Sequence, residues 1–141
     1  MNEILAKYSK PAAIAVLILL LLITAGWAYK YLYYTLPPQL VSITLKYQPE
    51  PPCRKDSPLY MQILNDSYRD VLGTSFSLSV KVDENSENIV SLLSNTFSTD
   101  TVIKAGNSHE GCWSFPKLYN NKHDPHKLIY EVERQLVRFS D

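Results

Sequence analysis

Residues 11–34 read PAAIAVLILLLLITAGWAYKYLYY, and this stretch decides how the chain is organised. From Pro11 to Tyr29 no side chain carries a charge. That run of about 19 residues would span roughly 28 Å as a helix, close to the thickness of a bilayer's hydrocarbon core. In lipid, a helix is the single-segment structure that satisfies its own backbone hydrogen bonds. We therefore predict a transmembrane helix over residues 11–34.

The residues that flank this segment predict its orientation. Lys7 and Lys10 precede it, whereas Lys30 is the one basic residue between its far end and Lys46. Because basic residues favour the cytoplasmic side, we expect residues 1–10 to form a cytoplasmic stub and the rest of the chain to lie outside the cytoplasm, periplasmic or extracellular. Aromatic rings favour the headgroup region, which predicts a membrane-interface belt made of Trp27, Tyr29, Tyr31, Tyr33 and Tyr34.

Two other interpretations of the apolar segment compete with this signal-anchor. A cleaved signal peptide also begins with basic residues, and Gly26 and Ala28 supply small residues two apart. The length of the apolar run and the bulky aromatic residues around that cut favour an uncleaved anchor. A buried helix of a soluble domain is disfavoured because the segment shows no polar face.

The residues after the anchor suffice for one small domain. Three of the 14 basic residues and one of the 14 acidic residues precede Thr35, which leaves 11 basic and 13 acidic residues in the domain. This slightly acidic balance, without a basic stripe, argues against a nucleic-acid partner. We expect the lipid bilayer, together with another membrane or exported protein, to be the partner.

The chain contains two cysteines, Cys53 and Cys112, and both follow the apolar segment. In an oxidising compartment such a pair is expected to join. The spacing would close a loop of about 60 residues, which the chain-entropy model values at about 4 kcal/mol. We predict a disulfide between Cys53 and Cys112, with two free buried thiols as the alternative.

Alternating apolar and polar residues predict a domain of short strands. Leu36-Pro37-Pro38 is expected to end the helix. Residues 35–52 then hold a proline-containing linker and a first strand over 40–47, and residues 53–141 hold the remainder of the domain. Residues 89–97 fit either a helical turn or a strand, and residues 105–111 read as a turn. The other predicted strands are 59–64, 74–82, 99–104 and 127–139. Residues 127–139 also fit a helical stripe through Leu128, Val132 and Leu136, but their β-branched and aromatic content favours a strand.

This pattern predicts an all-β fold, a small immunoglobulin-like β-sandwich that follows a single N-terminal transmembrane helix. In a sandwich, the apolar faces of two sheets are buried against each other. In the strand over 74–82, Phe76, Leu78, Val80 and Val82 would face the core. The Cys–Trp–Cys spacing of true immunoglobulin domains is absent, so the likeness concerns the general architecture alone.

The three histidines lie close together in the sequence. His109 precedes Cys112 by three residues, and His123 precedes His126 by three. Imidazole and thiolate are zinc and copper ligands, so this segment is the best candidate for a metal or small-ligand site. A disulfide at Cys112 would remove the thiolate, and histidine is common in polar loops, so surface histidines are the favoured interpretation. We expect no cofactor.

No catalytic motif is present. Ser114, His123 and Asp124 lack the strained nucleophile turn of hydrolases, and Glu131 and Glu133 fit a solvated strand face. We therefore predict no catalytic residues and no enzymatic activity. Trp113 is expected in the core beside the disulfide, and Asn65 begins an Asn-Asp-Ser glycosylation signal that matters if the chain enters a eukaryotic secretory route.

These features together predict a single-pass membrane protein. Its exported β domain would act as an interaction, accessory or assembly module of a larger membrane complex. The alternative is an exported domain that binds a metal or small ligand through the segment from His109 to His126.

Overall fold

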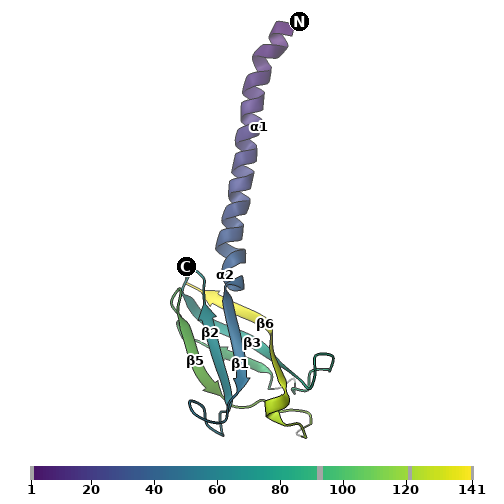
Figure 1. The fold of residues 1–141 in the computed structure, drawn as a ribbon. Helices are drawn as coiled ribbons and strands as arrows, with labels where there is room; N and C mark the ends of the chain where they lie inside the picture. The colour runs from purple at the N-terminus through teal and green to yellow at the C-terminus, as the bar shows by residue number, and fades with distance from the viewer. Residues whose placement is uncertain (1, 92–93, 121, 141) are drawn as a thin grey trace. The chain divides into compact units, whose positions relative to one another are not determined.

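The computed structural model describes residues 2–91, 94–120 and 122–140, and it divides into two compact units, Met1–Pro37 and Pro38–Asp141. The first unit is helical. It contains α1 (Asn2–Lys30) and the π-helical turn η1 (Tyr31–Thr35), and the helix then continues as α2 (Leu36–Gln39) (Figure 1). The helical stretch Ala13–Gln39, whose last two residues belong to the second unit, is long and apolar enough to cross a membrane.

The apolar side chains of this helix have no protein cover. Every residue from 13 to 32 is exposed, including the large aliphatic residues from Ile14 to Ile23. A helix buried in a soluble core would hide one face at least, so the structure does not support that interpretation. The predicted apolar helix is confirmed as a helix.

Both ends of the helix differ from the prediction. Helical structure begins at Asn2, within the predicted stub, and the predicted break at Leu36-Pro37-Pro38 is wrong because α2 runs through both prolines. The π-helical turn supplies the physical reason. Leu36 donates its N–H to the Tyr31 carbonyl, five residues earlier. Pro37 and Pro38, which follow, have no N–H that would need a hydrogen-bond partner in the helix.

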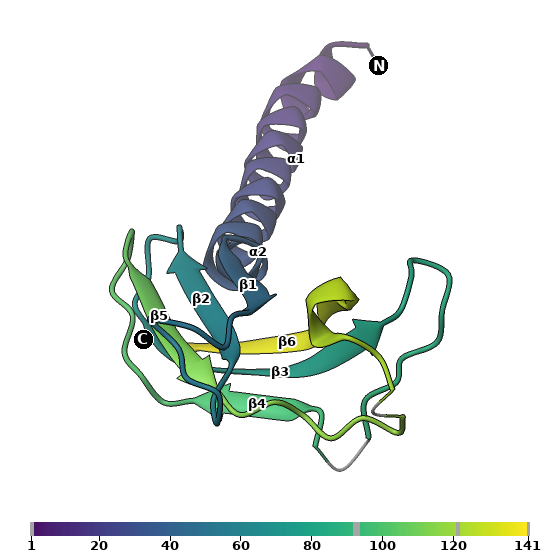
Figure 2. The same ribbon diagram turned by 60° about the horizontal axis from the view of Figure 1, so that its bottom comes forward.

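The second unit consists of two antiparallel three-stranded sheets, which form two layers in Figures 1 and 2. One sheet has the order β1-β2-β5 and the other the order β4-β3-β6. The chain crosses between the sheets after β2, β4 and β5. The strands are β1 (Val41–Tyr47), β2 (Leu59–Asn65), β3 (Val71–Lys81), β4 (Thr96–Thr99), β5 (Ser108–Trp113) and β6 (Ile129–Phe139).

The facing sides of the two sheets form the core. One buried cluster joins Met61 and Ile63 of β2 to Phe76 of β3, and a second joins Leu59 of β2 to Leu78 and Val80 of β3. Alternation places these side chains on the inner faces, as the sequence predicted for residues 76, 78 and 80. Val82, predicted to join them, lies beyond the end of β3 and is exposed.

A bulge in β6 sets which of its residues face the core. Ser75 of β3 pairs with Leu136, but Ser77 pairs with Glu133, so β6 has an extra residue between these two pairs. Arg134 has φ = 49°, in the left-handed region that a non-glycine residue seldom adopts. The bulge turns Val137 inward and leaves Leu136 on the outer face, 71% exposed.

Two of the sequence-based assignments, one strand and one turn, are wrong. We expected a strand over 99–104, but the strand in this region is β4, which ends at Thr99. Of the residues expected to form it, Ile103 makes an isolated bridge to Val71. The expected turn over 105–111 is largely β5, whose pairing to β2 comes from distant residues rather than from local strand propensity. In the undecided stretch 89–97, Val90 bridges to Leu118 and β4 begins at Thr96, whereas residues 92–93 lie outside the described residues.

The architecture is mostly β, but an immunoglobulin-like sandwich is not confirmed. In immunoglobulin domains the conserved disulfide joins the two sheets. Here Cys112 lies on β5, and Cys53 lies in the connection between β1 and β2 of the same sheet. The disulfide therefore holds a loop against an edge strand of its own sheet.

Candidate functional site

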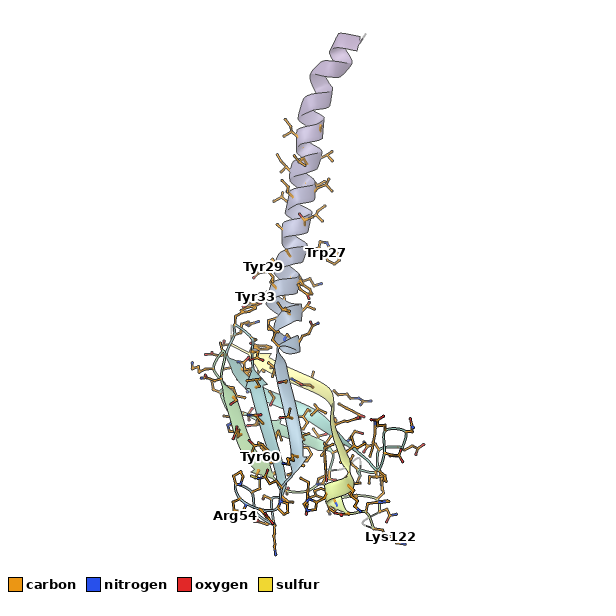
Figure 3. The ribbon with its side chains drawn as sticks, viewed as in Figure 1. Trp27, Tyr29, Tyr33, Arg54, Tyr60 and Lys122 are labelled. Carbon is orange, nitrogen blue, oxygen red and sulfur yellow. A yellow bond between two sulfur atoms is a disulfide. The ribbon has the colours of Figure 1, made fainter. Side chains whose placement is uncertain are left out.

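The predicted aromatic belt lies on the helix. Trp27, Tyr29, Tyr31 and Tyr34 are exposed, and Figure 3 shows Trp27 projecting from a different side of the helix than Tyr29 and Tyr33. The rings of Tyr29 and Tyr33, one helical turn apart, stack with centroids 5.6 Å apart. These rings face outward from an apolar helix, an arrangement that suits the headgroup region of a bilayer.

The predicted disulfide is present. Cys53 and Cys112 are joined, with their Cα atoms 5.5 Å apart, and no free cysteine occurs in the described part of the chain. Cys53 is buried and Cys112 is half-buried, opposite Tyr60 of β2. Hydrogen bonding to the Glu110 carboxylate, followed by burial, raises the pKa of the Tyr60 phenol. Because Cys112 is in the disulfide, it has no thiolate to add to the candidate metal ligands His109, His123 and His126.

The three histidines occupy three different settings. His109 lies on β5 with its ring 6.4 Å from that of Trp113. His126 lies in the short 3-10 helix η2 (Pro125–Lys127), with its ring 4.8 Å from that of Tyr47. Within residues 2–91, 94–120 and 122–140, no group of three His, Cys, Asp or Glu side chains could hold a metal ion.

His123 borders a hollow on the surface of the β domain. The hollow has a volume of about 540 Å³ and is lined by Phe115, Pro125 and neighbouring residues together with His123. Beside it, Tyr47 and Tyr130 each make edge contacts to the Phe115 ring, at 5.6 and 6.2 Å. The Tyr130 hydroxyl donates to the Pro125 carbonyl at 2.8 Å, and burial raises the pKa of this phenol. These contacts make a packed aromatic cluster rather than a set of converging ligands.

Trp113 is half-buried and packs against the core, so its predicted core position is confirmed only in part. Its ring packs against both hydrophobic clusters and lies over Gly111 of the same strand. A Cβ built on Gly111 would stand 2.7 Å from the ring. Glycine at this position therefore lets the largest aromatic side chain of the domain lie flat along β5.

Asn65 is the buried centre of a hydrogen-bond network rather than an accessible glycan acceptor. Its side chain is fully buried and its Nδ2 donates to the carbonyls of Arg69 and Ile103. Both hydrogens of the amide are used, and the folded domain has no room there for a sugar. Beside this network, Lys104 and the Ala105 N–H bond the Asp70 carboxylate and lower its pKa.

One surface that sequence reasoning left unassigned is the outer face of the sheet β4-β3-β6. We call it the serine face, because small hydroxyl side chains on β3 and β4 lie beside charged residues and one exposed leucine on β6. Its residues are Ser75, Ser77, Thr96, Ser98, Glu131, Glu133, Arg134, Leu136 and Arg138.

Ion pairs close both ends of this face. Lys81 bonds Glu131 at 2.6 Å, which raises the pKa of the lysine, and Arg138 bonds Asp100 at 3.1 Å. At the Arg138–Asp100 end, next to Leu136, lies a shallow hollow of about 240 Å³. Its lining includes Gly73, where a Cβ would stand 2.9 Å from the Thr99 carbonyl oxygen. One feature of the sequence indicates this face. The polar run Glu133-Arg134-Gln135 interrupts the alternation of apolar and polar residues, and the next residue, Leu136, is an apolar residue on the polar side of the strand.

Comparison with known proteins adds no further constraint. No family model, curated protein or solved structure matches this chain. The function has to be argued from the helix and the surfaces of the β domain.

Proposed function

We propose that this chain is a single-pass membrane protein of the signal-anchor type. Its N-terminus faces the cytoplasm, and its β domain acts outside the cytoplasm as an interaction, accessory or assembly module of a membrane complex. The observation that carries this proposal is the helix Ala13–Gln39, in which the apolar side chains from residue 13 to residue 32 have no protein cover. A bilayer would bury them, at a gain of about 25 cal/mol for each Å² of apolar surface.

The orientation follows from the charges around that helix and agrees with the cysteine chemistry. Basic residues precede the apolar segment, which favours a cytoplasmic N-terminus. A disulfide between Cys53 and Cys112 suits an oxidising compartment on the opposite side. Both arguments place the β domain outside the cytoplasm in this proposal.

The role as an interaction module rests on what the domain exposes. Its two clusters of buried side chains are modest, but it leaves large apolar side chains in solvent on strands and loops away from the core. These residues are Tyr68, Val102, Tyr119 and Leu136, each more than half exposed. Exposed aromatic and aliphatic residues of this kind are typical of protein contact surfaces.

Labelling of intact cells tests the orientation. We expect Thr44→Cys, an exposed position on the outer face of β1, to react with a membrane-impermeant maleimide without cell lysis. Its matched control, Asn2→Cys, should react after lysis alone. Labelling of Asn2→Cys in intact cells, with Thr44→Cys protected, would reverse the topology and remove the argument for an exported domain.

Capture from solubilised membranes tests the role. The full chain should retain the same membrane proteins as a version in which residues 11–29 are replaced by an unrelated apolar helix, because the β domain carries the contact. The opposite result would assign the interaction to the membrane segment. In that case the membrane proteins would be lost when the helix is replaced, and they would still be captured when the β domain is exchanged for an unrelated one.

A further inference from the structure

The serine face exposes a large apolar side chain, which a sheet surface in contact with water alone does not require. Leu136 is 71% exposed in the middle of β6, whereas the other outward residues of that strand are charged. The Arg134 bulge is what places it there. A non-glycine residue in the left-handed region is strained, so the strand accepts strain in a conformation that presents Leu136 outward.

The surface beside Leu136 consists of small side chains around a shallow hollow. Ser75 lies opposite Leu136 on β3, and Ser98 lies opposite Ser75 on β4. Serine side chains leave room above the sheet for side chains from another molecule. The bonded pairs Lys81–Glu131 and Arg138–Asp100 border this region and keep their charges partly neutralised. A second sheet can therefore approach closely over the serines.

The charges along β6 run from acidic to basic in chain order. Glu131 and Glu133 come first, the bulge residue Arg134 follows, and Arg138 comes after Leu136. Glu133 and Arg134 are both exposed and adjacent at the point where the sign changes. A strand with this order is complementary to an antiparallel copy of itself, because the acidic half of each then faces the basic half of the other.

We propose that the serine face binds the serine face of a second copy of this chain. In this two-fold arrangement β6 lies antiparallel to β6 of the other copy. Glu133 of each copy faces Arg134 of the other, and Leu136 of each then lies opposite Glu131 of the other, whose carboxylate is already paired with Lys81. The inference goes beyond the proposed function and does not depend on it, because it concerns the isolated chain as much as a complex.

The size of the face sets the expected strength. A strand of 11 residues is roughly 35 Å long, and three strands are about 10–15 Å wide, so each copy would bury roughly 400–500 Å². The two copies together would bury about 800–1,000 Å², which is below the roughly 1,200–2,000 Å² of stable specific interfaces and in the range of weak, transient ones. We therefore expect a reversible dimer that forms at micromolar concentrations, strengthened where both copies are confined to one membrane.

Charge reversal with mixing tests the pairing. Sedimentation velocity of the full chain in detergent micelles, over a concentration series, should show reversible dimerisation of the wild-type protein. Glu133→Arg places two arginines opposite each other, and Arg134→Glu places two glutamates opposite each other. Each variant alone should therefore stay monomeric, whereas an equimolar mixture of the two should form dimers because both contacts become complementary again. Leu136→Ser should weaken the wild-type dimer at least tenfold.

Controls separate this surface from others. Glu84→Arg reverses an exposed charge on the loop after β3 and should dimerise as the wild-type protein does. Near-UV circular dichroism of each variant checks that the domain is folded. Dimers that persist in both Glu133→Arg and Arg134→Glu would assign the contact to the helix or another face and overturn the proposal. A wild-type chain that stays monomeric throughout the series, or a mixture that does not dimerise, would overturn it as well.

Discussion

The side chain of Asn65 makes four hydrogen bonds inside the domain. Nδ2 donates to the carbonyls of Arg69 and Ile103, and Oδ1 accepts from the backbone N–H and the hydroxyl of Ser67. These bonds join the end of β2, the connection to β3 and the segment before β5. A polar residue that is fully buried is stabilising only when each of its groups finds a partner, and here each does.

We expect Asn65→Ala to destabilise the domain by about 3 kcal/mol, because it removes four hydrogen bonds inside the domain and takes from the buried Ser67 N–H the acceptor that Asn65 supplies. Thermal unfolding of the full chain in detergent, followed by near-UV circular dichroism, would measure the change. Asn85→Ala, in the exposed loop after β3, is the matched control and should be nearly neutral. Equal melting temperatures for Asn65→Ala and the wild-type protein would show that the network contributes nothing.

At the scale of the strand, β5 depends on the fit between Gly111 and Trp113. We expect Gly111→Ala to destabilise the domain by about 1–3 kcal/mol, because the new methyl group displaces a ring that packs against both clusters. The control is Gly106→Ala, where φ is +73° but a new Cβ would meet no atom within 4 Å, so the cost is backbone strain of about 1 kcal/mol. Denaturant unfolding would rank the two, and a larger effect at Gly106 would contradict the packing argument.

The same strand shows what the sequence could and could not predict. Strands with regular alternation, such as the one containing Phe76, Leu78 and Val80, were predicted with their inner faces, because burial on one side leaves a period of two in the sequence. β5 contains serine, histidine, glutamate and glycine, a composition that does not favour a strand locally. Its pairing with β2 is a tertiary contact that local composition does not record.

The candidate site was predictable in part for the same reason. The disulfide followed from the count of cysteines and their position after the apolar segment. The serine face did not, because it depends on the bulge at Arg134, and a bulge shifts the alternation of β6 in a way that a strictly alternating template misreads. Unbroken alternation would put Leu136 on the same face as Val132, which packs against the core, but the bulge leaves Leu136 outside.

On the scale of the whole domain, the disulfide joins parts of the chain that are far apart in sequence and held weakly by other contacts. Cys53 and Cys112 are 59 residues apart. β5 is an edge strand that pairs with β2 alone, and Cys53 lies in the long connection between β1 and β2. Closing a loop of this length in the unfolded chain contributes about 4 kcal/mol in the chain-entropy model, against a total stability of about 5–15 kcal/mol for a domain.

We therefore expect the double variant Cys53→Ser/Cys112→Ser to lower the melting temperature by more than about 10 °C, because a loss of that size is a large fraction of the total. Changing both cysteines avoids a free thiol that could form bonds between molecules. Hydrogen exchange locates the effect: protection should fall most in β5 and in the connection that holds Cys53, and least in β3, which lies in the other sheet. Uniform loss across both sheets would mean that the bond stabilises the domain as one cooperative unit. Unchanged melting would mean that the pairing of β2 with β5 suffices alone, and that the bond adds no stability.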